Sequence, residues 1–186
     1  MAITSKKLTL EQFLRLPEKK PALEYEEGRI TQKPLPRGKH SVLQFKVADA
    51  VNRLAAPPRI AMAFPELRFT YEERSYVPDV SVYRYERIPR DASGEVADDF
   101  FIPPDIAIEI LSLGQSLNAL IRKCAWYTSN GVAAALLVSP ADRSVRLFLP
   151  GQVPRALLGQ DPIDLGDLLP GFRLTVEQLF QSLRDM

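Results

Sequence analysis

The sequence has little cysteine, no long hydrophobic segment and almost no net charge. Its only cysteine is Cys124, so an internal disulfide and a thiolate metal cluster are excluded. Cys124 lies on the apolar face of a predicted helix, which indicates a small buried core residue rather than a nucleophile. No segment approaches the roughly 20 apolar residues that span a membrane, and the first residues lack the apolar run of a signal peptide. We therefore expect a cytoplasmic protein with no membrane partner.

The net charge of +1 conceals an uneven distribution along the chain. Between residues 91 and 109 there are acids but no Lys or Arg, whereas the segment 29–59 is basic and contains one acid, Asp49. Such a basic segment is typical of a surface that binds a polyanion such as DNA, and it is equally typical of a solvated surface. Its basic residues are Arg29, Lys33, Arg37, Lys39, Lys46, Arg53 and Arg59.

The order of the predicted elements indicates an α/β fold. A short helix begins at Thr9, and a hairpin follows with its turn near Glu27 and Gly28. Apolar spacing predicts an amphipathic helix over 39–56, with Val42, Phe45, Val47, Val51 and Leu54 on its apolar face. Alternation predicts strands over 60–71 and 77–85, and an apolar run predicts a buried strand over 105–111.

The second half of the chain continues the same pattern. A helix is predicted over 115–129, with Ser112 as its N-cap and Gln115 at the capping-box position. Two strands and a final helix from Thr175 follow. No internal repeat or domain boundary is evident, so we expect one domain over 1–186, with a core at about 20–150 and an appended segment at 151–186.

Two carboxylates occupy unusual positions in this pattern. Glu109 lies in the middle of the apolar strand IAIEI, where an unpaired carboxylate is costly, and Asp79 directly follows Pro78 at the start of the preceding strand. If these strands pair, both carboxylates point to one place, where oxygen ligands suit Mg²⁺. The alternatives are a turn residue for Asp79 and an ion pair with an arginine for Glu109.

Several short motifs together resemble a known family. VPDV (77–80), IAIEILS (106–112) and RKCAWY (122–127) are similar in order and spacing to the PD-(D/E)XK nuclease superfamily, and most similar to the Uma2 family of putative restriction endonucleases. LEYEEGRI (23–30) and PRGKH (36–40) are similar to the hairpin and the histidine loop of that family. The resemblance covers about residues 9–150. One departure is Leu111, which stands where the superfamily has lysine; in the Uma2 family the lysine comes from the following helix, where Lys123 matches it.

The resemblance implies a restriction-endonuclease-like core, a central mixed β-sheet flanked by helices, and a Mg²⁺-dependent (or Mn²⁺-dependent) endonuclease that hydrolyses DNA. It implies that Asp79, Glu109 and the backbone carbonyl of Ile110 bind the metal. Lys123 would then orient the attacking water or stabilise the charge on the phosphate. Tyr127 lies on the same flank of the helix as Lys123. The residues that would line the site are Glu24, His40, Ser112 and Tyr127, and those that would contact DNA are Arg37, Lys39 and Lys46.

Each of these residues also has a simpler interpretation. Lys123 and His40 can be polar surface residues, Glu24 can be a charge on a strand face, and Ser112 can serve only as a cap. The competing functions are a non-catalytic nucleic-acid-binding domain of the same fold and a structural or interaction protein whose acids form ion pairs. As an endonuclease the chain would act as a homodimer, because one site cuts one strand. A separate partner is a candidate source of specificity.

Overall fold

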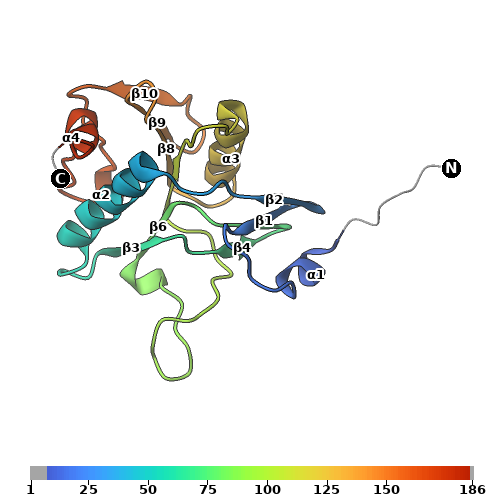
Figure 1. Cartoon of the computed structure of the whole chain (residues 1–186). Coiled ribbons are helices and arrows are strands. Elements are labelled where there is room, and N and C mark those ends of the chain that lie inside the picture. Colours follow the sequence, from blue (N-terminus) through green and yellow to red (C-terminus); the bar gives the residue numbers. More distant parts are fainter. Residues whose placement is uncertain (1–7, 185–186) are drawn as a thin grey trace.

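The structure, a computed structural model, describes residues 8–184 and is built on two sheets (Figure 1). The larger sheet has six strands in the order β10-β9-β8-β7-β6-β3, and the smaller has four in the order β2-β1-β5-β4. The pair β7–β8 is parallel and the other neighbours in the larger sheet are antiparallel, which confirms the predicted mixed sheet. The strands are β1 (Leu23–Glu26), β2 (Arg29–Gln32), β3 (Ala61–Pro65), β4 (Phe69–Tyr71), β5 (Arg74–Tyr76), β6 (Val80–Arg84), β7 (Ile106–Ile110), β8 (Ala134–Ser139), β9 (Ser144–Phe148) and β10 (Arg155–Leu158).

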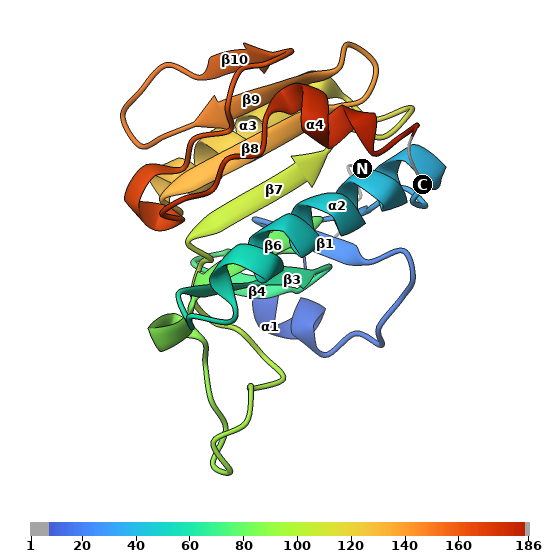
Figure 2. The same cartoon turned by 90° about the vertical axis from the view of Figure 1, so that its left-hand side faces the viewer.

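Helices cover both faces of the six-stranded sheet. Helices α2 (Gly38–Ala55) and α4 (Val176–Gln181) lie on one face, and α3 (Leu117–Ser129) lies on the other, as Figure 2 shows. Alternation along β7 divides its side chains between two cores: Ile108 packs on the α2 side and Ala107 on the α3 side. Glu109 follows Ile108 in the strand, so it points to the same side as Ala107 and faces α3. Cys124 is fully buried in the core on that side, as expected.

The N-terminal elements follow the sequence pattern closely. Helix α1 (Leu10–Leu14) begins with a capping box between Thr9 and Gln12. In the hairpin β1–β2, Glu27 and Gly28 form the turn with φ of 49° and 90°. Positive φ at both central residues is the requirement of the tight turns that join antiparallel strands. Both the capped helix and the hairpin were predicted, and both are confirmed.

The predicted strand over 60–71 is wrong in one important respect, because it is two strands in different sheets. Strand β3 belongs to the six-stranded sheet and β4 to the four-stranded sheet. The chain turns between them at Glu66, which has φ of 52°. This left-handed conformation is unfavourable for a residue other than glycine, asparagine or aspartate. The break therefore places the Glu66 side chain at the junction of the two sheets.

Two further expectations are corrected. Phe45 is 71% exposed although it was assigned to the apolar face of α2, whose buried side chains are His40, Leu43, Val47, Ala48, Val51 and Ala55. The N-cap of α3 is Ser116, whose side chain accepts a hydrogen bond from the Ala119 N–H, and not Ser112. Ser112 does contact Gln115, since its N–H donates to Gln115 Oε1 at 2.8 Å, but this turn precedes the helix.

The C-terminal segment, expected to be appended, is built into the core within the described residues. Strand β10 extends the six-stranded sheet beyond β9, and α4 packs on the same face as α2. Two short 3-10 helices, η1 (Tyr85–Arg87) and η2 (Gly166–Leu168), complete the elements. The segment buries Leu169, Phe172 and Phe180 against the sheet, so it shares one hydrophobic core with the rest of the chain.

Across residues 8–184, no helix has both the length and the apolar character required to cross a membrane.

Candidate metal-binding and catalytic site

Asp79 lies one residue before β6 and is 2% exposed. Because β6 pairs antiparallel with β7, with Val80 opposite Ile108, the next position along the strand places Asp79 beside Glu109. The Asp79 Oδ2 atom accepts a hydrogen bond of 2.6 Å from the Ile110 N–H, and Oδ1 lies 2.6 Å from Lys33 Nζ. Burial opposes ionisation of Asp79, but contacts with His40 and Lys33 outweigh it and lower the pKa of the carboxyl to about 2. Asp79 is therefore an anion at neutral pH.

Glu109 lies in the centre of β7 and is also 2% exposed. Its Oε1 atom accepts a hydrogen bond of 2.7 Å from the Tyr127 hydroxyl and lies 2.9 Å from Lys123 Nζ. Burial raises the pKa of Glu109, and the attraction of Lys123 opposes that rise. The strand thus holds a carboxylate whose charge depends on a neighbouring cation.

Lys123 connects Glu109 with a third acid from the small sheet. Its Nζ lies 2.7 Å from Glu24 Oε1 in β1, and the same Glu24 oxygen accepts a hydrogen bond of 2.9 Å from the Val77 N–H. Burial opposes the charge of Lys123, but Glu109 and Glu24 outweigh it and raise the pKa of the ammonium. The structure therefore brings together four residues that the sequence assigned to the site: Glu24, Glu109, Lys123 and Tyr127.

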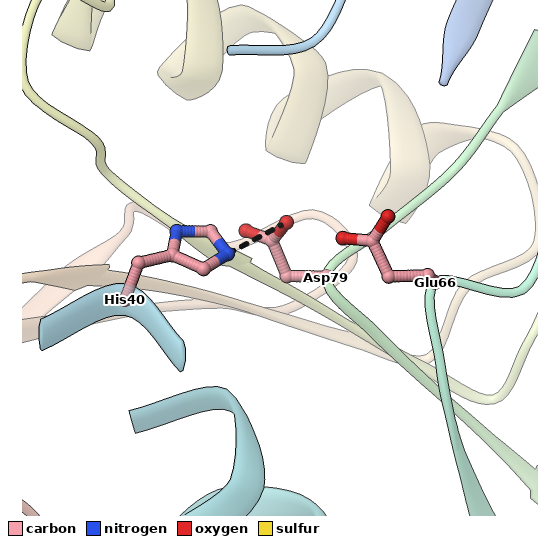
Figure 3. Close-up of side chains that lie close together, drawn as sticks. All are labelled: His40, Glu66 and Asp79. Carbon is pink, nitrogen blue, oxygen red and sulfur yellow. Dashed lines mark ion pairs between the residues drawn. The ribbon is translucent and has the colours of Figure 1, made fainter. Parts of the chain in front are cut away.

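His40 stands at the N-terminal end of α2 and is 7% exposed. Its Nδ1 lies 2.9 Å from Ser112 Oγ, so two more predicted site residues are in contact. Its Nε2 lies 3.4 Å from Asp79 Oδ1 (Figure 3), yet it is a buried atom without a hydrogen-bond partner. A buried imidazole nitrogen without a hydrogen-bond partner is unusual and requires a physical explanation.

Three residues of the site were not identified from the sequence. Lys33, directly after β2, is buried between the Asp79 and Glu66 carboxylates, with Nζ 2.6 Å from Asp79 Oδ1 and 3.4 Å from Glu66 Oε1. Gln44 of α2 donates to the Asp79 carbonyl at 2.8 Å and to Glu66 Oε1 at 3.4 Å. Burial opposes the charge of Lys33, but Asp79 and Glu109 outweigh it and raise its pKa. Lys33 and Gln44 resemble ordinary surface residues in the sequence, and Glu66 was hidden inside a strand predicted as continuous.

A cavity of about 770 Å³ opens beside these residues. Among its lining residues are Asp79, His40, Lys33 and Glu66, whereas Glu109 and Lys123 are not part of its described wall. Further lining comes from most of the segment 13–23 and from Arg68, Asp98 and Phe101. The site therefore has an outer layer that faces the cavity and an inner layer, formed by Glu24, Glu109, Lys123 and Tyr127, that lies behind it. Asp79 belongs to the outer layer and contacts the inner one through Ile110.

The three residues expected to contact DNA lie on or next to α2. Arg37 is the N-cap residue of this helix, and Lys39 directly precedes His40. Both basic side chains are exposed. Lys46 lies further along the helix and is half-buried. Arg37 and Lys39 are thus close in sequence to a residue that lines the cavity, while Lys46 is separated from it by more than one helical turn.

The donor atoms of the outer layer fit a divalent cation. His40, Glu66 and Asp79 each offer one ligand atom, and these atoms all lie within 4.8 Å of one another. Carboxylate oxygens suit Mg²⁺ and Mn²⁺, and an imidazole nitrogen suits transition-metal ions. The unpartnered Nε2 of His40 is a free ligand position, and Lys33 already shows that a cation is stable between Asp79 and Glu66. The residues present therefore fit a metal.

A protein-family model and a solved structure are both similar to this chain over most of its length. The model of the Uma2 family, described as putative restriction endonuclease, matches residues 10–177. A crystal structure at 1.96 Å resolution of a putative nuclease belonging to DUF820, from Anabaena variabilis, is 39% identical in sequence. The match covers 95% of this chain and 99% of that chain, with a TM-score of 0.92. No curated protein matches the chain.

Proposed function

This chain belongs to the Uma2 family of putative restriction endonucleases, and we propose that it is a metal-dependent endonuclease that hydrolyses phosphodiester bonds of DNA. The observation that supports this most directly is the pair of buried carboxylates, Asp79 and Glu109, on paired strands beside a cavity that Asp79 lines. Buried acids are costly to a fold, and a catalytic cation is a reason to retain them. The solved neighbour is itself named a putative nuclease.

In this proposal Asp79, Glu109 and the backbone carbonyl of Ile110 hold the divalent cation, Mg²⁺ or Mn²⁺. Such a cation polarises the scissile phosphate and lowers the pKa of a bound water. Ile110 has two roles in this proposal: its carbonyl would bind the cation, and its N–H donates to the Asp79 carboxylate and fixes its orientation. The Tyr127 hydroxyl does the same for Glu109.

Lys123 has two functions in this arrangement. It keeps Glu109 and Glu24 ionised inside the protein, and it retains donor capacity, because an ammonium has three N–H donors and two of them point to these carboxylates. We propose that the third donor orients the attacking water. Lys33 faces the cavity and supplies positive charge where the phosphate would enter.

The substrate is proposed to be DNA, with Arg37, Lys39 and Lys46 as contacts to the phosphate backbone. Because one site cuts one strand, cleavage of a duplex favours a homodimer. A cytoplasmic location and a separate specificity partner belong to the same proposal.

One observation favours a second candidate function, a structural or binding domain without catalysis. The carboxylates already have cationic partners, since Lys33 contacts Asp79 and Lys123 contacts Glu109. Ion pairs of this kind satisfy buried acids without a metal. A test of function must therefore show that cleavage depends on a metal ion, and not only that these residues stabilise the fold.

The function is tested by incubating the protein with supercoiled plasmid and 5′-labelled single-stranded DNA or RNA, in Mg²⁺ or Mn²⁺. We expect nicked and then linear plasmid with either metal and no product in EDTA. Glu109→Gln, which preserves the shape of the side chain, is expected to slow cleavage at least about 100-fold, because it removes one metal-binding charge.

Glu177, a half-buried residue of α4 that pairs with Arg143, provides a matched control, since Glu177→Gln makes the same chemical change outside the site. Equal cleavage by the wild type and Glu109→Gln would show that the activity comes from elsewhere. Cleavage of RNA alone would replace the proposed substrate, and a lack of cleavage on every substrate would favour the binding-domain alternative.

A further inference from the structure

Lys33 occupies a position that resembles a cation site. Its ammonium lies between Asp79 Oδ1 and Glu66 Oε1 and also donates to the Val77 carbonyl at 2.8 Å. The side chain is 8% exposed, so the ammonium has exchanged water for three oxygen atoms. Oxygen atoms arranged around a buried positive charge are also what a divalent cation requires.

The Nε2 atom of His40 completes this group on the side of Asp79 (Figure 3). Nδ1 is engaged with Ser112 Oγ, whereas Nε2 lies 3.4 Å from Asp79 Oδ1 and is buried without a hydrogen-bond partner. In the tautomer in which Nδ1 carries the proton, the Nε2 lone pair and Asp79 Oδ1 are two ligand atoms available to one cation. A hydrogen bond from the second ring nitrogen is also the usual way in which proteins orient a metal-binding histidine.

We propose that His40 Nε2, Glu66 and Asp79 form a second divalent-cation site on the cavity side of Asp79, and that the Lys33 ammonium fills this position when no cation is bound. This site is distinct from the one formed by Asp79, Glu109 and Ile110, with which it shares only Asp79. Its nitrogen ligand selects a transition-metal ion such as Mn²⁺ over Mg²⁺. The inference rests on the proposed function only in giving the second cation a role.

The geometry is compatible with this assignment. Two ligands on opposite sides of an ion with bonds of about 2.1 Å are about 4.2 Å apart, so ligand atoms within 4.8 Å of one another need to move by only a few tenths of an ångström. Glu66 has the freedom to do so, because its side chain is 46% exposed. The Gln44 amide donates both to Glu66 Oε1 and to the Asp79 carbonyl, so it holds the Glu66 carboxylate next to Asp79.

Displacement of Lys33 has a direction. Lys33 lines the cavity, so its flexible side chain can swing from its buried position into the cavity, where water solvates the ammonium. A cation that enters between Asp79 and Glu66 therefore places the Lys33 ammonium in the cavity, where a phosphate group would bind. Metal binding and phosphate binding are in this way coupled through one side chain.

The site is tested by three-pulse electron spin echo spectroscopy of Mn²⁺ bound to the full chain, prepared without a histidine tag. His40 is the single histidine of the sequence, so a modulation from an imidazole nitrogen bonded to Mn²⁺ has one source. We expect this modulation in the wild type and its loss in His40→Gln. If Mn²⁺ binds to the wild type without nitrogen modulation, the second site is wrong.

Titration of Mn²⁺ by calorimetry supplies a measurement that does not depend on His40. Glu66→Gln, at a half-exposed position, is expected to weaken binding at the nitrogen-modulated site about tenfold or more. Lys33→Met is expected to strengthen it about tenfold or more, because it removes the competing positive charge. Arg155→Met removes the same charge from β10, at the far edge of the sheet, and is expected to change nothing. Unchanged affinity in both Glu66→Gln and Lys33→Met overturns the site.

Failure of this inference can be distinguished from failure of the proposed function. Metal-dependent cleavage that is lost in Glu109→Gln, together with bound Mn²⁺ that lacks nitrogen modulation, retains the nuclease and removes the second site. Nitrogen-modulated Mn²⁺ without cleavage of any nucleic acid retains the metal site and removes the nuclease.

Discussion

Replacing Lys123 by methionine is expected to lower the free energy of unfolding by about 3–5 kcal/mol at neutral pH, because it leaves buried carboxylates without their counter-ion. Lys123 Nζ lies 2.7 Å from Glu24 and 2.9 Å from Glu109, and both acids are at least nine-tenths buried. Methionine approximates the length of the lysine side chain, so the change removes charge more than volume. Urea unfolding followed by circular dichroism measures the difference.

A second substitution tests the cause of this loss. If uncompensated charge is responsible, Glu109→Gln in the Lys123→Met background restores part of the stability, and the two changes are strongly non-additive. Arg122→Met is the matched control, because Arg122 is the preceding residue of α3 and is exposed. A loss in Lys123→Met no larger than that in Arg122→Met would show that the inner ion-pair network contributes little.

Replacing Asp79 by asparagine is expected to abolish both metal binding and cleavage. Asp79 belongs to the proposed catalytic site and to the second cation site, so Asp79→Asn removes one charge from each. We expect cleavage to fall at least about 1,000-fold, which corresponds to about 4 kcal/mol of transition-state stabilisation. The stabilisation by Mn²⁺, about 2.7 kcal/mol for the wild type at 100 times the dissociation constant, is expected to disappear. Thermal melting with and without Mn²⁺ measures it.

Asp105→Asn is a suitable comparison for this variant. Asp105 is also buried and pairs with Arg87 at 2.7 Å, but it does not line the cavity. This variant is expected to lose some stability and to keep its response to Mn²⁺. An equal response to Mn²⁺ in the wild type and Asp79→Asn would mean that the cation binds elsewhere.

The elements that position the site were predictable because each has a local signal. Alternation and turn residues determine the hairpin around Gly28, and apolar runs determine β6 and β7. The pairing of these two strands then brings Asp79 and Glu109 together. Glu109 was noticeable because a charge inside an apolar strand is rare, and this signal does not depend on tertiary structure.

The outer layer of the site was not predictable in the same way. Glu66 is placed by a left-handed turn between two strands, and the sequence 60–71 has no glycine or asparagine to indicate it. Lys33 is buried only because the small sheet packs beside Asp79, so nothing in its neighbours along the chain distinguishes it from Lys39. Helical spacing allowed Lys123 to reach Glu109, and tertiary packing decided that it does.

Binding of a divalent cation by Asp79 is measured most directly by anomalous diffraction from a crystal of the wild-type chain soaked in Mn²⁺. We expect an anomalous peak within bonding distance of Asp79, shared with Glu109 and the Ile110 carbonyl. We also expect a second peak shared with His40 and Glu66, with Lys33 displaced into the cavity. A soaked crystal with no peak at Asp79, and with Lys33 still between Asp79 and Glu66, would contradict cation binding by Asp79.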